Sequence, residues 1–363
     1  MPTRREFVST VAGAAAGLMV TDRGLAAAGI PRPRADQAGR REVSIGGRRV
    51  KVVDIHAHCV IPEAAEVVKG TPFFDAARRG GPNVLGPDRL KVMDEQGLDV
   101  QVLSINGYWW YGADRDLAGR IVQAQNDGLA TWVAAHPDRF VALASVSLQY
   151  PDLAAAQLEQ AVKTHGMRGV SIGGHMRGEN LTLPKYDPFW AKAAELGVLV
   201  LMHPQGGDNL LREGALDGRG DLGNIIGNPL ETTVFLSRLI FDGTLDKFPG
   251  LKVLGPHAGG YLPSYLGRSE AACEVRASAE CANKRRPSDY LKKEIVIDTM
   301  VFSEEGLRHL VAEVGVGQIL YGTDIPFNWP VTVDLVLKAP FLSDPDRAAI
   351  LGGNAMRVLG IPA

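Results

Sequence analysis

Two histidines separated by one residue are the feature of this sequence that most directly suggests chemistry. His56 and His58 end an apolar run that begins at Val52. Side chains two residues apart on a strand point to the same face, so the two imidazoles can bind one divalent metal ion together. The pair stands at the C-terminal end of a predicted buried strand, where parallel-barrel enzymes keep their chemistry.

Three further polar residues stand in the same relative position, just beyond other apolar runs typical of buried strands. They are His203, His257 and Asp324. Each one alone can be read as an ordinary polar group at a strand end or turn. Because the C-terminal ends of parallel strands meet at one face of a barrel, their common placement predicts a site built from imidazoles and a carboxylate.

Eight β-rich apolar runs alternate with segments of helical periodicity. The runs are residues 50–55, 100–105, 140–146, 168–172, 198–202, 251–255, 294–298 and 318–321. The helical segments are 87–97, 114–136, 152–165, 187–197, 231–241, 303–314 and 344–359. This alternation predicts an α/β fold of the closed (β/α)8 type, with the metal site at the C-terminal mouth of the strands. A doubly wound open sheet is the alternative, and the sequence lacks the glycine-rich dinucleotide turn that would favour it.

The first residues predict a signal peptide rather than part of the fold. Arg4 and Arg5 precede a short apolar stretch, residues 11–20, and small residues follow it. The stretch is too short for a transmembrane helix, which needs about 20 apolar residues. The arginine pair resembles a twin-arginine signal over residues 1–28, so we expect a periplasmic protein that is not membrane-bound after signal removal. A frayed N-terminal helix is the alternative.

The rest of the chain divides into an extension and a barrel. Residues 29–49 are predicted to form a loose extension and a hairpin, and residues 50–363 the barrel, with an insertion at about 270–290. Cys273 and Cys281 lie in that insertion and could bridge in an exported protein. On one continuous helix they would be about 12 Å apart, too far for a disulfide. The sequence leaves this pairing open.

The composition is that of an ordinary globular protein. Hydrophobic residues make up 45% of the chain and charged residues 22%, and the formal net charge is -2. Such a balance gives no reason to expect nucleic acid or an anionic membrane surface as a partner. A homodimer is compatible with it.

Beyond these features, the chain resembles the amidohydrolase superfamily, in particular the branch of α-amino-β-carboxymuconate-ε-semialdehyde decarboxylase and related aromatic-acid decarboxylases. The resemblance runs from about Val52 to Leu359. The stretches that carry it are residues 54–58, 93–97, 126–127 with 137–140, 228–233, 248–252, 257–260 and 322–327.

The resemblance implies one divalent metal ion, zinc in the first place, with manganese or cobalt also suitable for such donors. The implied ligands are His56, His58, His203 and Asp324. The implied catalytic residues are His257, as proton donor and acceptor, and Asp324, as a hydrogen-bond acceptor. Two-metal members carry a carboxylated lysine at the end of strand four. Residues 169–175 contain no lysine, which favours one metal.

The resemblance also implies a reaction, the decarboxylation of a small unsaturated or aromatic carboxylic acid. The family decarboxylase holds a substrate carboxylate with an arginine from the loop after strand one. Arg78 and Arg79 are predicted to serve here, since arginine binds carboxylates bidentately, although both could be solvated loop charges. Arg89 is expected to face solvent.

Further substrate contacts are predicted at the barrel mouth. Trp109 is predicted to cover a planar acid and His175 to line the pocket, with core packing and loop capping as the respective alternatives. Residues 205–207 read Gln-Gly-Gly where the family decarboxylase has an aromatic residue, so the semialdehyde itself is not the expected substrate. Asp298 is predicted to support the metal site or the barrel mouth.

Two other functions stay open at this point. The same barrel and metal could hydrolyse a lactone, ester or amide, with His257 stabilising an oxyanion. An arginine in the pocket and the release of CO₂ would separate the two reactions. An exported binding protein on an inactivated barrel is disfavoured because the whole ligand set is present.

Overall fold

The computed structural model describes residues 39–362 except 75–83 and Tyr108. The predicted signal peptide, residues 1–28, therefore lies outside the described residues. So do Arg78 and Arg79, the predicted substrate-binding arginines, and residues 29–38 of the predicted extension.

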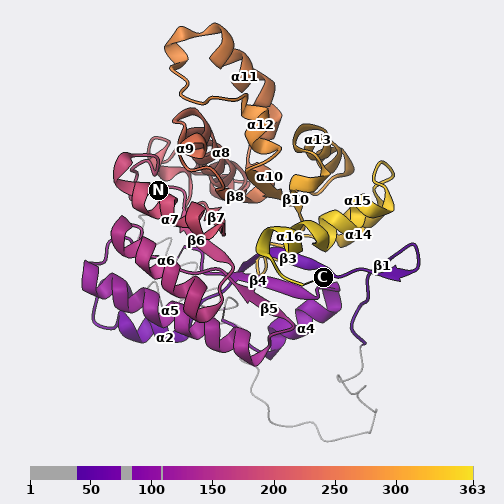
Figure 1. Ribbon diagram of the computed structural model, residues 1–363. Helices are drawn as coiled ribbons and strands as arrows, with labels where there is room; N and C mark the ends of the chain where they lie inside the picture. Colours follow the sequence, from indigo (N-terminus) through magenta and orange to yellow (C-terminus); the bar gives the residue numbers. More distant parts are fainter. Residues whose placement is uncertain (1–38, 75–83, 108, 363) are drawn as a thin grey trace, which may run out of the picture. The chain divides into compact units, whose positions relative to one another are not determined.

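Eight parallel strands form the centre of the part of the chain that the structure describes (Figure 1). They are β3 (Val53–His58), β4 (Val100–Ser104), β5 (Phe140–Ala142), β6 (Gly169–Gly173), β7 (Leu199–His203), β8 (Lys252–Gly255), β9 (Ile295–Asp298) and β10 (Ile319–Leu320). Strands β3 to β5 pair in chain order, as do β6 to β10. The N–H of Ala144 donates to the Gly169 carbonyl at 2.8 Å, and that of Ile55 donates to the Tyr321 carbonyl at 2.9 Å. These bonds join the two sheets on both sides, so the predicted (β/α)8 barrel is confirmed.

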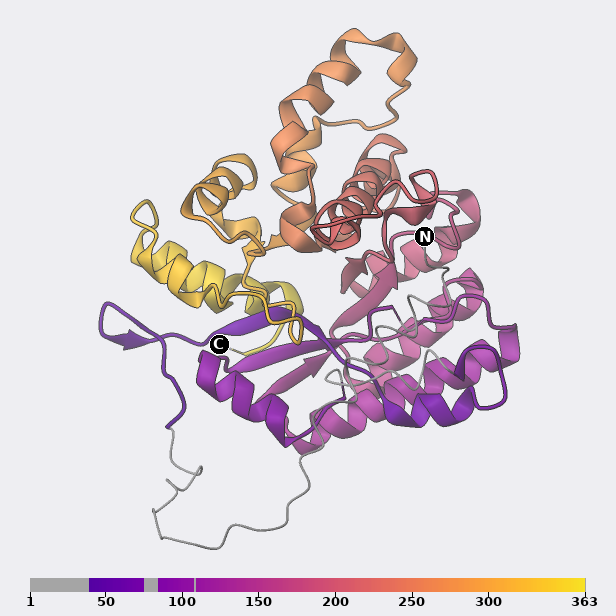
Figure 2. The ribbon, with the colours of Figure 1, turned by 180° about the vertical axis from the view of Figure 1, so that it is seen from behind.

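Helices surround the strands on the outside of the barrel (Figures 1 and 2). The helices of the described residues are α2 (Pro62–Val67), α4 (Pro87–Gln96), α5 (Arg115–Ala135), α6 (Pro151–His165), α7 (Asp187–Leu196), α8 (Asn228–Phe241), α9 (Thr244–Lys247), α10 (Pro256–Gly259), α11 (Leu266–Val275), α12 (Pro287–Leu291), α13 (Glu304–Val314), α14 (Val333–Lys338), α15 (Asp344–Ala348) and α16 (Asn354–Leu359). The side chain of Asp114 caps the start of α5 by accepting from the Leu117 N–H. Helix α4 ends at Gly97, whose left-handed backbone suits glycine. Among the described residues, no helix combines the length and the apolar character needed to cross a membrane.

The apolar core has two layers, which the alternation along β7 makes visible. Leu199 and Leu201 belong to an inner cluster built from strand residues and α16. Val200 and Met202 belong to an outer cluster that includes residues of the surrounding helices. Since side chains alternate along a strand, His203 shares the inner face with Leu199 and Leu201. The packing of β7 thus directs this histidine into the barrel mouth.

Two features lie outside the barrel proper. A short antiparallel hairpin, β1 (Ser44–Ile45) and β2 (Arg48–Arg49), precedes β3. An arm that contains α11 and α12 projects from the barrel (Figures 1 and 2). In this arm Cys273 and Cys281 form a disulfide, with their Cα atoms 5.8 Å apart. The single-helix geometry that would have kept them apart does not apply, because α11 ends at Val275.

Candidate metal centre and active site

A β-bulge aims the two histidines of β3 into the mouth of the barrel. Three residue steps of β3, from Asp54 to Ala57, lie opposite two steps of β4. The extra residue allows Ile55 to pack in the inner apolar cluster while its neighbour His56 also faces inward. Without the bulge, these consecutive side chains would point to opposite faces. Bulges commonly re-aim side chains next to active sites in this way.

Four side chains from three strand ends converge at this mouth. They are His56, His58, His203 and Asp324, and one candidate ligand atom from each lies within 4.8 Å of the others. Oδ1 of Asp324 is 3.3 Å from Nε2 of His56 and 2.9 Å from Nε2 of His58. All four residues are buried. The described residues therefore contain a single divalent-metal site, formed by the four residues that the family resemblance implied.

The donor atoms of this cluster fit a metal ion. Among the described residues, Nε2 of His56, Nε2 of His58 and Oδ1 of Asp324 are buried and have no hydrogen-bond partner. A buried polar atom left unsatisfied costs about 1–3 kcal/mol, so three such atoms close together fit the binding of a cation. Nδ1 of His203 lies 2.9 Å from the Pro204 carbonyl, which leaves its Nε2 for a ligand bond. Three imidazoles and one carboxylate suit zinc, manganese or cobalt.

Asp298, at the end of β9, supports the site as expected. Its buried carboxylate accepts from Nδ1 of His56 at 2.8 Å, which fixes Nε2 as the ligating nitrogen. It also accepts from the N–H groups of His257 and Ala258, at 3.0 and 2.7 Å. These two residues have φ angles of 53° and 59°, a left-handed backbone that costs about 1–3 kcal/mol in a non-glycine residue. The bonds to Asp298 stabilise this strained turn.

The strained turn places His257 beside the cluster. Its Nε2 lies 3.8 Å from Oδ2 of Asp324. Its ring centroid is 5.3 Å from that of His56 and 5.5 Å from that of His203. His257 therefore lies next to the four ligands without being one of them. This position is compatible with the predicted proton transfer, a role that stays a prediction.

Burial and charge act against each other in setting the pKa values of the cluster. Burial acts to lower the pKa of His56, but the carboxylates of Asp324 and Asp298 outweigh it and raise that pKa to about 9. Burial lowers the pKa of His58 to about 4 and that of His203 well below its usual range. Burial acts to raise the pKa of Asp324, but the neighbouring imidazoles hold it well below its usual range. Two neutral imidazoles and an ionised carboxylate are protonation states that bind metal.

Two aromatic residues after Asp324 belong to the site, and sequence reasoning missed them. Nε1 of Trp329 donates to Oδ2 of Asp324 at 3.1 Å, and its ring stacks on Phe302 with centroids 5.2 Å apart. Phe327 presents its ring to His58 at 4.8 Å in an edge-on geometry. The available signal was their closeness in sequence to Asp324. The sequence does not reveal the turn that brings these two residues back to the site.

Arg89 is buried, which corrects the expectation that it faces solvent. Only 5% of the residue is exposed. Its guanidinium donates to the His58 carbonyl at 2.8 Å and to Oε1 of Gln101 at 3.0 Å. Gln101 donates to Asp54, which also accepts from the segment just before Asp324. Arg89 lies four residues before Met93 on the buried stripe of α4, so the helix turns it toward the strands.

Trp109 and His175 lie near the mouth. Trp109 is buried, donates from Nε1 to the Ser171 carbonyl at 3.0 Å and stacks on Tyr111. Nδ1 of His175 accepts from the Gly178 N–H at 2.8 Å. Both side chains thus have structural partners of the kind that the alternatives foresaw. Contact of either residue with a substrate stays a prediction.

Glu231 of α8 is a second residue that sequence reasoning did not single out. The residue is 2% exposed, and its Oε2 accepts from the N–H of Gln205, two residues beyond His203. Burial raises the pKa of Glu231 to about 7, although backbone N–H groups act to lower it. Its other oxygen is 3.8 Å from Nε2 of His175. Glu231 therefore anchors the loop that follows a metal ligand.

Comparison with known proteins gives results that agree with this geometry. Residues 53–361 match the family model described as amidohydrolase. The chain is 31% identical over 322 residues to 2-amino-3-carboxymuconate-6-semialdehyde decarboxylase of Dictyostelium discoideum. The aligned part covers 85% of this chain and 84% of that protein.

Solved structures show the same fold. The 2,6-dihydroxybenzoate decarboxylase from Rhizobium, complexed with 2,6-dihydroxybenzoate, has a TM-score of 0.75 at 29% identity. The match covers 86% of this chain and 99% of that one. The dihydroxybenzoic acid decarboxylase from Polaromonas sp. JS666, with bound manganese and the inhibitor 2-nitroresorcinol, has a TM-score of 0.74 at 28% identity, with coverages of 86% and 97%. The family match extends over nearly the whole barrel, from β3 to the end of α16. The chain therefore belongs to the amidohydrolase family.

Proposed function

We propose that this protein is a metal-dependent decarboxylase that removes CO₂ from a small aromatic or unsaturated carboxylic acid. The observation that carries the proposal is the buried cluster of three imidazoles and one carboxylate with His257 beside it. The names of the relatives support the choice of reaction, because they describe decarboxylases of such acids.

The reaction needs a proton and a place for an electron pair. When the bond to the carboxyl carbon breaks, CO₂ leaves and the electron pair stays on the substrate carbon, which a proton must then reach. A divalent ion held by His56, His58, His203 and Asp324 would supply a Lewis acid to withdraw electron density from the substrate. His257 delivers the proton, and Asp324, whose Oδ2 faces it at 3.8 Å, orients and stabilises the protonated ring. Trp329 holds that same carboxylate oxygen in place.

For the native metal we propose zinc or manganese. Three nitrogen donors favour zinc by ligand softness, whereas the Polaromonas relative was solved with manganese. Elemental analysis of the purified protein, followed by reconstitution of the metal-free form with each ion, distinguishes the two. The expected content is about one ion per chain.

The experiment that tests the reaction is a screen of aromatic and unsaturated acids on the metal-loaded protein, with CO₂ release as the readout. Arg78→Met and Arg79→Met then test the carboxylate contact, with Arg268→Met, an exposed arginine on α11, as the control. Loss of a bidentate charge-assisted pair should raise KM or lower kcat by roughly 10²-fold for one of the two variants.

Hydrolysis of a lactone, ester or amide is the alternative outcome of that screen. If no acid releases CO₂ while such a compound is cleaved, the decarboxylase proposal is wrong. The same conclusion follows if CO₂ release survives in a metal-free sample, since the proposal assigns the Lewis acid to the metal.

We also propose that the protein is exported to the periplasm. The arginine pair Arg4 and Arg5 and the short apolar stretch after it support export. The Cys273–Cys281 disulfide supports it independently, because disulfides persist in oxidising compartments. The homodimer stays a prediction.

A further inference from the structure

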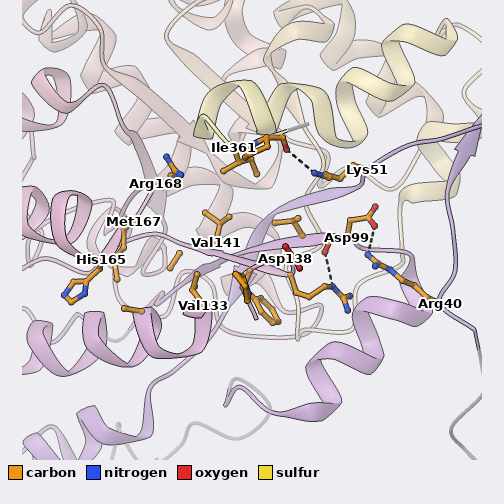
Figure 3. A pocket seen from close by; sticks show the side chains of 18 of the residues that line it. Arg40, Lys51, Asp99, Val133, Asp138, Val141, His165, Met167, Arg168 and Ile361 are labelled. Atoms are coloured by element: carbon orange, nitrogen blue, oxygen red, sulfur yellow. Dashed lines mark hydrogen bonds and ion pairs between the residues drawn. The ribbon is translucent and has the colours of Figure 1, made fainter. Parts of the chain in front are cut away.

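A pocket of about 490 Å³, whose lining is drawn in Figure 3, lies on the N-terminal side of the barrel strands. Its wall includes Val100 and Phe140, the first residues of β4 and β5, and Arg168, which directly precedes β6. The metal ligands lie at or beyond the C-terminal ends of β3, β7 and β10. Because the strands are parallel, the pocket belongs to the N-terminal face and the metal centre to the C-terminal one. The pocket is therefore separate from the proposed active site.

The described residues of the pocket wall carry more positive than negative charge. The cations are Arg40, Arg49, Lys51, Arg139 and Arg168, and the carboxylates are Asp99 and Asp138. Asp99 accepts from Arg40 at 2.5 Å and from Arg49 at 2.6 Å. Arg139 pairs with Asp94, which lies outside the pocket wall, at 2.8 Å. Glu42, which also lies outside the wall, is 3.5 Å from Arg49. Arg40, Arg49 and Arg139 thus each have a carboxylate partner.

The two remaining cations of the wall are Lys51 and Arg168. Within the described chain, neither has a carboxylate within ion-pair distance. Nζ of Lys51 donates to the Pro362 carbonyl at 3.1 Å, and Arg168 is exposed. In Figure 3 the two side chains lie on either side of Ile361. Two cations that keep unused donors thus border the same cavity.

The remaining wall is largely apolar. Val133 of α5, Val141 of β5 and Ile361 are only partly buried and line the cavity. Cavities of about 300–1,000 Å³ that combine an apolar lining with a few polar groups are typical of sites for small organic ligands. A ligand that satisfies both parts of this wall needs an apolar body and an anionic group.

We propose that this pocket binds a small organic anion, an aromatic-sized body that carries one carboxylate. The carboxylate lies between Lys51 and Arg168, and the body packs against Val141 and Ile361. Asp138, which also lines the pocket, favours a ligand with a single negative charge over a dianion. The inference goes beyond the proposed decarboxylation and does not depend on it.

Benzoate and its neutral isostere benzamide are suitable probes for the full-length, metal-loaded protein. Ligand-observed NMR titration should show that benzoate binds more tightly than benzamide and that its affinity falls as salt is added. Arg168→Ala and Lys51→Ala should each weaken binding at this pocket by about tenfold or more, as expected for a lost charge-assisted bond. Both substitutions should preserve the fold, since neither side chain has an ion-pair partner in the part of the chain that the structure describes. Arg268→Ala, which removes an exposed arginine elsewhere, should leave binding unchanged.

Benzoate can also enter the active site, so its position must be determined separately. Hydrogen-exchange mass spectrometry should show that benzoate protects residues 165–168, at the pocket, in both the wild type and His257→Ala. Protection confined to the barrel mouth would overturn the proposal, as would equal affinities for benzoate and benzamide. Equal benzoate binding by Arg168→Ala, Lys51→Ala and Arg268→Ala would overturn it as well. None of these results bears on CO₂ release, so the two proposals fail separately.

Discussion

The substitution Asp298→Asn is expected to weaken both the metal site and the fold around it. Among the described residues, Oδ2 of Asp298 accepts from Nδ1 of His56 and the N–H of His257, and Oδ1 accepts from the N–H groups of Ala258 and Met300. Asparagine replaces one of these oxygens by an NH2 group, which can only donate. Whichever way the amide turns, two donors lose their acceptor.

The size of the effect follows from that count. A hydrogen bond to a charged group contributes about 1.5–3 kcal/mol, so the loss of two lowers the free energy of unfolding by about 3–6 kcal/mol. If the amide nitrogen faces His56, Nδ1 loses its acceptor, as counted above. The ring can regain a hydrogen bond there only by moving its proton to Nε2, which blocks metal binding. Loss of such a supporting contact typically weakens metal affinity by about 10–100-fold.

Two measurements check this expectation. Chelator competition gives the metal affinity, and denaturant unfolding of the metal-free proteins gives the stability. The matched control is Asp152→Asn, because Asp152 is exposed and pairs with Arg115, an ion pair of a class that contributes about 0–1 kcal/mol. If Asp298→Asn binds metal as tightly as the wild type and unfolds with the same free energy as the control, the assigned role of Asp298 is wrong.

Three further predictions concern the metal, the loop anchor and export. Elemental analysis should find no metal in Asp324→Ala, whereas His257→Ala should keep the metal and lose about 10²–10⁴-fold in turnover. A metal-loaded Asp324→Ala or a fully active His257→Ala would contradict these roles. Because burial raises the pKa of Glu231 from 4.5 to about 7, the native protein keeps a proton that the unfolded chain releases, so stability should fall as pH rises through that window. Over this pH range the free energy of unfolding of Glu231→Gln should fall by up to about 3 kcal/mol less than that of the wild type. Identical pH profiles for the wild type and the variant would refute the raised pKa. Replacing Arg4 and Arg5 together by lysine should keep the protein in the cytoplasm on cell fractionation, and normal periplasmic accumulation would rule out the twin-arginine route.

Much of the barrel could be predicted because its signals are local. Each apolar run of the sequence coincides with a strand, from β3 to β10, and α4 to α8 and α13 coincide with predicted helical segments. The period of the apolar residues and the glycines or prolines at the ends of these segments determine such elements. The strand-end residues of the site, His257 among them, could be found for a related reason, and the family resemblance then implied which four are ligands. Parallel strands bring their C-terminal ends to one face, so residues at strand ends meet whatever their distance in sequence.

The supporting residues could not be predicted, because their positions depend on contacts between distant segments. Arg89 looked like a solvent-facing residue until the packing of α4 against the strands turned it toward His58. The bulge in β3 depends on its pairing with β4, which no local pattern reveals. Trp329 reaches Asp324 only because the backbone turns back after β10.

The amino-acid sequence by itself thus determined the alternation of strands and helices, the ligand set and the family resemblance. The tertiary structure decided how those ligands are held. Asp298 lies 242 residues from His56 in sequence, yet their hydrogen bond selects the nitrogen that faces the metal site. The tertiary structure also decided that Cys273 and Cys281 form a disulfide, because α11 ends at Val275, between the two residues. The physical reason is that spacing along the chain defines the direction of a side chain within its own element. Which group it meets there depends on how the elements pack.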